Sequence, residues 1–192
     1  MSLINPIQQP YPATRTGLDT VIESIQTQLA TLPWITAPLL RAWNLPETRD
    51  GKLYRNPRIY SGDKEHFNSM FNDEQTATSF CIGVGSATPS EETEGFQSPI
   101  LWNKRLDLII HGDLKKIDDT KDYIFTEELI EQVLNVLSKT RGITISAIWS
   151  DDIQDIFQQF DLSEIERDFL YYPHFGIRFE LDVSYRAGGI IC

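Results

Sequence analysis

Residues 175–186, FGIRFELDVSYR, alternate between apolar and polar side chains with a strict period of two. Successive side chains of a β-strand point to opposite faces, so this pattern predicts a strand with one buried and one exposed face. The charged residues expected on the exposed face are Arg178, Glu180, Asp182 and Arg186. Alternating charges can pair with a neighbouring subunit and set its register, and the plainer alternative is a solvated sheet face.

Two segments have the three- and four-residue apolar spacing of amphipathic helices. The first spans 17–32 with Thr16 as its expected N-cap, and the second spans 127–139 with Thr126 as its expected N-cap. Two shorter helices are expected at 151–160, capped by Ser150, and at 163–170. The core residues predicted from these patterns are Leu18, Ile22, Ile25, Leu29, Leu108, Ile110, Ile130, Val133, Leu137, Phe179, Leu181 and Val183.

Further strands are predicted at 53–60, 79–85, 100–111 and 143–149. Prolines and tryptophans predict an irregular segment at 34–47, and polar residues predict loops at 86–99 and 112–122. Strands grouped before a helix favour an α+β fold, with a mainly antiparallel sheet packed by two amphipathic helices and extra short helices. Prolines in residues 1–16 predict an extended N-terminal arm, and residues 17–192 are expected to form a single α+β domain.

Composition argues against several classes of partner. The net charge of −11 makes the chain a poor candidate for capturing nucleic-acid phosphates, and no apolar run approaches the length that spans a bilayer. The N-terminal residues do not resemble a signal peptide, so synthesis in the cytoplasm is expected. Cys81 and Cys192 have no metal-binding or disulfide-framework spacing.

Candidate chemical motifs are weak. The histidines His66, His111 and His174 are far apart in sequence, and no nucleophile motif accompanies them. Gly83 and Gly85 lack the third glycine and the following helix of a dinucleotide site. We therefore expect no catalytic residue, metal or cofactor, and interpret the chain as a subunit of an assembly. Tyr171 and Tyr172, which lead into the last strand, either pack in the core or add aromatic contact area to a subunit interface, and we take them as candidate interface residues.

The order of elements resembles that of the tail terminator and tail-completion (neck) proteins of tailed bacteriophages. The resemblance runs from TGLDTVIESIQTQLATL through SFCIGVG, ILWNKRLDLIIH and TEELIEQVLNVLSK to FGIRFELDVSYR, about residues 17–186. It is a likeness of pattern, and residues 150–172 and 1–16 are additions to that pattern.

What the resemblance implies is a non-enzymatic structural protein of the virion tail and neck. It would form a homo-oligomeric ring, typically a hexamer, that ends the tail tube and joins it to the head. Its partners would be further copies of itself, the tail tube protein and the head–tail connector or neck proteins, without sequence-specific nucleic-acid binding. A non-viral α+β binding or assembly module remains the alternative, and an enzyme with dispersed active-site residues is a third.

Overall fold

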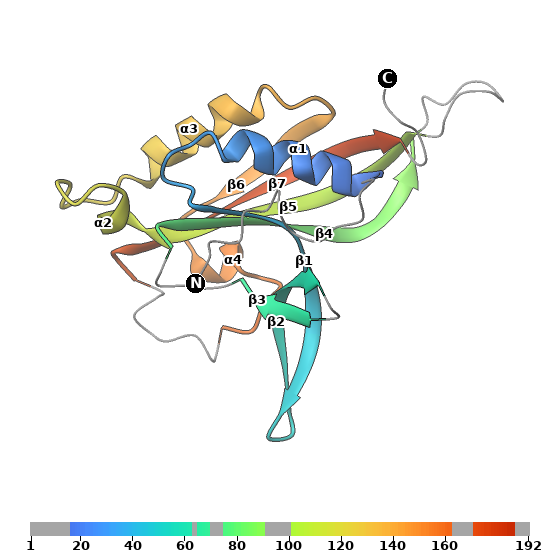
Figure 1. Ribbon diagram of the computed structural model, residues 1–192, viewed down its shortest axis with the longest axis horizontal. Coiled ribbons are helices and arrows are strands. Elements are labelled where there is room, and N and C mark those ends of the chain that lie inside the picture. Colours follow the sequence, from blue (N-terminus) through green and yellow to red (C-terminus); the bar gives the residue numbers. More distant parts are fainter. Residues whose placement is uncertain (1–15, 63–64, 70–74, 91–100, 163–170, 187–192) are drawn as a thin grey trace.

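The computed structural model describes residues 16–62, 65–69, 75–90, 101–162 and 171–186. Within these residues the chain forms one seven-stranded sheet and four helices (Figure 1). In chain order the elements are α1 (Leu18–Leu29), β1 (Ala37–Arg49), β2 (Lys52–Gly62), β3 (Glu65–Asn68), β4 (Ala77–Pro89), β5 (Leu101–Asp113), α2 (Leu114–Ile117), α3 (Thr126–Leu137), β6 (Ile143–Trp149), α4 (Ile153–Ile156) and β7 (His174–Arg186).

The strand order across the sheet is β3-β2-β1-β4-β5-β7-β6. The β1–β4 pair is parallel, and the other neighbouring pairs are antiparallel. The predicted α+β class with a mainly antiparallel sheet is therefore confirmed. The predicted arm falls outside the described residues except for Thr16, as do the predicted helix at 163–170 and most of the loop at 86–99.

The two long helices, α1 and α3, lie side by side on one face of the sheet (Figure 1). Their apolar stripes pack against the apolar phase of β5 and β7 in the larger of two hydrophobic cores. All twelve residues predicted for the core are buried, so the helical and strand periodicities were interpreted correctly.

The helix caps differ from the prediction. Gly17 occupies the N-cap position of α1, and no side chain caps that helix. Thr126 is the first residue of α3 and is itself buried, because the preceding Phe125 inserts into the core. Asp152, and not Ser150, caps α4: its carboxylate accepts a hydrogen bond from the Gln154 amide at 2.8 Å.

The opposite face of the sheet is covered as well. Here α4 and the residues after it bury Ile156, Phe157 and Phe160 against Phe80 of β4 and Ile109 of β5. The apolar residues expected in the helix at 151–160 are therefore packed, although the helix itself is a single turn. This second core has direct consequences for the charged residues of β7.

Strand β1 occupies residues 37–49, so most of the segment 34–47, which the prolines led us to interpret as irregular, is a strand instead. Its register shifts between Pro38 and Arg41, and beyond Ala42 it pairs with β2 alone. Asp50 and Gly51 join β1 to β2 with φ values of 49° and 75°, the left-handed pair that a tight hairpin turn requires. The resulting hairpin projects away from the helices and the body of the sheet (Figure 1).

The predicted polar loop at 112–122 contains the short helix α2. Its first residue, Leu114, is buried in the larger core, and its amide donates a hydrogen bond to the Pro173 carbonyl at 2.9 Å. The start of this segment is thus helical and tied to the segment that leads into β7, which corrects the prediction of a loop throughout 112–122.

Acidification from pH 7 to pH 5 should lower the free energy of unfolding through His111, by about 2 kcal/mol. This side chain is buried between the rings of Phe80 and Phe157, and burial lowers its pKa to about 4. An unfolded histidine has a pKa near 6.5, so the unfolded chain takes up a proton that the folded chain resists. The stabilisation is complete above about pH 6.5 and is lost progressively as the pH falls towards 4.

Urea unfolding of the wild type and of His111→Gln at the two pH values measures this effect. The variant should lack this component of the pH dependence, whatever the carboxylates contribute to both proteins. An equal pH dependence in the two proteins would assign the effect to other groups.

Candidate subunit interface

The charged residues of β7 do not form one exposed row. Asp182 and Arg186 are exposed, but Arg178 is 2 % exposed and Glu180 is 9 % exposed. The expectation that all four face solvent is therefore wrong for Arg178 and Glu180. The physical reason is the second core: α4 and the residues after it cover the middle of the sheet face on which these side chains lie.

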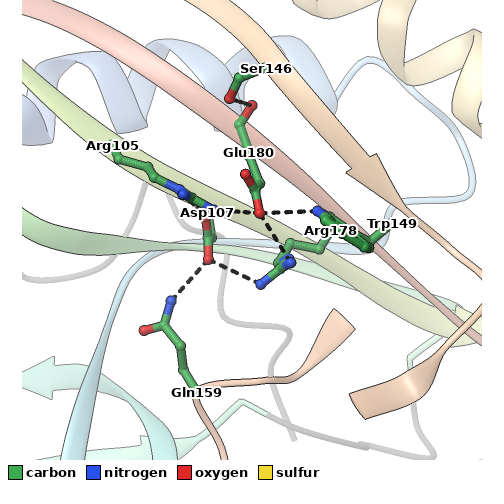
Figure 2. A network of polar contacts seen from close by, with 7 residues as sticks. All are labelled: Arg105, Asp107, Ser146, Trp149, Gln159, Arg178 and Glu180. Carbon is green, nitrogen blue, oxygen red and sulfur yellow. Dashed lines mark hydrogen bonds and ion pairs between the residues drawn. The ribbon is translucent and has the colours of Figure 1, made fainter. Parts of the chain in front are cut away.

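Arg178 and Glu180 belong to a buried charge cluster, which also contains Asp107 of β5 and, at its margin, Arg105 of β5, whose side chain is 41 % exposed (Figure 2). The Arg178 Nη2 atom lies 3.1 Å from Glu180 Oε1, and Arg178 Nη1 lies 3.7 Å from Asp107 Oδ2. Arg105 pairs with Glu180 and lies 3.7 Å from Asp107. Two cations and two anions thus neutralise one another on one face of the sheet.

Three uncharged side chains complete the buried charge cluster (Figure 2). Gln159 Nε2 donates to Asp107 Oδ2 at 2.9 Å, and Trp149 Nε1 donates to Glu180 Oε1 at 3.0 Å. The Arg178 guanidinium lies 5.3 Å from the centre of the Trp149 ring, within the range of a cation–π contact. Ser146 Oγ also donates to the Glu180 carbonyl at 3.1 Å.

Strand pairing explains why this cluster needs its arginines. Asp107 and Glu180 are directly opposite each other in the β5–β7 register, where two like charges repel. Burial raises the pKa of Asp107, and the charge of Glu180 raises it further. Arg178 and Arg105 act in the opposite direction, and the Gln159 hydrogen bond supports them. The arginines therefore allow two buried carboxylates to face each other.

The buried charge cluster connects segments that are distant in sequence. It joins β5 and β7 to Trp149 at the end of β6 and to Gln159 after α4. Its four charged residues form ion pairs with one another, although Arg105 Nε, Asp107 Oδ1, Arg178 Nε and Arg178 Nη1 have no hydrogen-bond partner among the described residues. We therefore interpret it as a structural device that fixes the end of β6, and not as the contact surface predicted from the alternation.

The other predicted interface residues are exposed but do not form one patch. Tyr171 and Tyr172 are 65 % and 40 % exposed, and the Lys115 ammonium lies 5.7 Å from the centre of the Tyr172 ring. They precede β7, whereas Arg186 ends it, about 40 Å away at the rise of an extended strand. A contact of Tyr171, Tyr172, Asp182 or Arg186 with another subunit stays a prediction, and one contact could not include all of them.

A more prominent surface is the basic hairpin, which we define as residues 41–58 of β1 and β2. Trp43 is 41 % exposed and Leu45 is 38 % exposed on one side of it, and Leu53 is 57 % exposed on the other. Arg41 stacks at 4.0 Å on the Trp43 ring, and Arg58 pairs with Glu47 on the same side. Sequence reasoning missed this surface, although the Asp50-Gly51 pair is a strong hairpin signal.

The opposite edge of the sheet is formed by β6, which no described strand pairs on its outer side. Ile148 and Trp149 near its end are 37 % and 38 % exposed. Their placement follows from a register shift between Ile145 and Ala147, which turns Trp149 toward Arg178. The sheet therefore has the basic hairpin, with exposed apolar side chains, near one edge, and at the other edge β6, whose last two residues are exposed and apolar and whose outer side no described strand pairs.

The histidines and cysteines offer no alternative centre in the described part of the chain. There, no group of three histidine, cysteine or acidic side chains is arranged to hold a metal ion. His111 contacts the Ser69 carbonyl at 3.1 Å inside the second core. Burial raises the pKa of the Cys81 thiol to about 12, which keeps it protonated and unreactive at neutral pH.

Comparison with protein-family models, with curated proteins and with solved structures finds no match to this chain. None of the described helices is long and apolar enough to cross a membrane.

Proposed function

We propose that this protein is a structural subunit that assembles with copies of itself into a ring, and that the ring ends the tail tube of a tailed bacteriophage and joins it to the neck. One observation carries the self-assembly. Exposed apolar side chains lie on a projecting hairpin near one edge of the sheet and on an open strand at the other edge. Isolated surface apolar residues are ordinary, but an open apolar strand edge invites pairing with another chain.

The position of the two surfaces favours a ring over a two-fold dimer. A contact between different surfaces of identical subunits is heterologous, and repeated heterologous contacts produce closed rings when the rotation between neighbours closes. Surfaces at opposite edges of one sheet suit such a contact. The resemblance to tail terminators adds the expected number of six subunits.

The tail role is supported by the order of elements. The chain has an amphipathic helix first, then strands, then a helix across the sheet and a late alternating strand. This is the order on which the resemblance to tail terminator and tail-completion proteins was based.

The mass of the purified protein, measured by sedimentation, should therefore be about six times the 22.0 kDa mass of one chain, and electron micrographs should show rings. Native mass spectrometry supplies the exact number of subunits. In a second step, adding the protein to polymerising tail tube protein should stop tube growth, and labelled protein should be found at tube ends. A monomer at all accessible concentrations would contradict the ring, and rings that leave tube growth unchanged would contradict the tail role.

A further inference from the structure

We propose that the basic hairpin of one subunit docks on the open edge of β6 in the next copy of this chain. This inference rests on the proposed self-assembly and specifies the surfaces that meet. It is carried by the edge of β6, which no described strand covers, by the exposed apolar side chains of the hairpin, and by the opposite charges beside these two surfaces.

The β6 edge lacks most of the features that keep edge strands from pairing. Its sequence, ITISAIW, has no charged residue and no proline, and it is rich in β-branched residues. Natural proteins usually protect such edges with lysines, prolines, bulges or a covering segment. The register shift near Ser146 is the one such feature within this strand. An edge of this kind is suited to being covered by another chain.

The buried charge cluster fixes the position of Trp149 at the end of β6, which is the surface that would accept the hairpin. Trp149 is held by its hydrogen bond to Glu180 and by the Arg178 guanidinium near its ring, yet 38 % of the residue stays exposed. Holding an aromatic side chain in place before binding reduces the entropy that is lost on association. Trp149 therefore provides a preorganised apolar anchor at the end of β6, and the exposed Ile148 adds apolar area on the opposite face of the strand.

The basic hairpin, which would dock on this anchor, also carries exposed apolar side chains. Trp43 and Leu45 lie on one side of the basic hairpin, and β1 beyond Ala42 has no described partner on its outer side. Within the described residues, the hairpin thus offers both apolar side chains and a strand edge that no other strand pairs. Addition of a strand to an open sheet edge is a common mode of protein association.

Charge complementarity selects the second copy as the occupant. The basic hairpin contains five basic and two acidic residues, which give it a net charge of +3. The whole chain has a net charge of −11, so the residues outside the hairpin together carry −14. Lys52 and Arg55 on the hairpin are exposed and form no ion pair within the described part of the chain. Beside the end of β6, Asp151 and Asp152 are exposed. A basic hairpin on a strongly acidic protein is attracted to this acidic end in another copy.

A charge exchange tests the docking. The hairpin variant carries Lys52→Glu and Arg55→Glu, and the acceptor variant carries Asp151→Lys and Asp152→Asn. Asparagine keeps a side-chain oxygen for the cap of α4, so the acceptor variant should retain its fold. Each variant alone should lower the association constant at least about tenfold at low salt. The chain that carries all four substitutions should have an association constant within about threefold of the wild-type value.

Sedimentation across a salt series measures assembly, and circular dichroism checks folding. The matched control for the hairpin variant is Lys139→Glu with Arg141→Glu, which makes the same change in net charge as that variant at exposed positions outside both surfaces. It should assemble like the wild type at moderate salt. A monomeric wild type would overturn the proposed function together with this inference. A wild type that assembles, combined with no rescue by the four substitutions, would overturn the docking alone.

Discussion

Arg178→Ala should lower the free energy of unfolding by about 3–5 kcal/mol, because it leaves buried carboxylates without their main counter-charge. Arg178 is 2 % exposed and pairs with both Asp107 and Glu180. Those two acids are directly opposite in the β5–β7 register, so their repulsion is no longer compensated from the β7 side. Burial already raises the pKa of Asp107, and removal of the arginine would raise it further.

Denaturant unfolding at pH 7 measures the loss. The matched control is Arg186→Ala, on the same strand and exposed, which should change stability by less than about 0.5 kcal/mol. Adding Asp107→Asn to Arg178→Ala should recover part of the loss, because it removes one of the two buried anions. A cost for Arg178→Ala as small as that of Arg186→Ala would mean that Arg178 lies in solvent.

The strongly periodic parts of the fold could be predicted from sequence. The stripes of α1 and α3 and the alternation of β7 each place one apolar phase against the larger core. Because these patterns extend over three turns or nine residues, a single exception does not obscure them. The helix starts were less predictable, because Phe125 was drawn into the core in preference to a side-chain cap at Thr126.

The burial of Arg178 could not be predicted from β7 alone, because a charged phase is typical of a solvated face. The sequences of the neighbouring strands do indicate that this face of the sheet is covered. β4 has apolar residues on both phases, as with Phe80 and Cys81, and so does β5, as with Ile109 and Leu108. Strands that are apolar on both phases indicate a sheet covered on both faces. The segment that covers this face, residues 156–160, also contains three large apolar residues, which is unusual for a solvent-exposed turn.

The basic hairpin was missed for a different reason. Pro38 and Pro46 argue against a strand, since proline cannot donate a ladder hydrogen bond. The structure places Pro38 beside the register shift in the β1–β4 pair. Pro46 lies in the projecting part of β1, which has no described strand on its outer side. Both sites tolerate proline, so the segment is a strand despite its composition.

Phe157→Ala should also lower the free energy of unfolding by about 3–5 kcal/mol, the usual cost of removing a buried phenylalanine ring. Phe157 is 1 % exposed, and its ring meets His111 edge to face with centroids 6.2 Å apart. The ring also lies close to the backbone of β7, where a Cβ atom added to Gly176 would come within 3.2 Å of it. A one-turn helix such as α4 has little stability of its own, so its position depends on this packing.

Equilibrium unfolding measures this cost, and the exposed neighbour Gln158→Ala is the control, with an expected change below about 0.5 kcal/mol. The comparison decides between two descriptions of the same sheet face. If the face is covered, Phe157→Ala is costly and the amides of 153–160 exchange faster in the variant, because their segment is held less tightly. If Phe157→Ala costs no more than Gln158→Ala, the face is open, and the charged residues of β7 return to solvent as their alternation predicted.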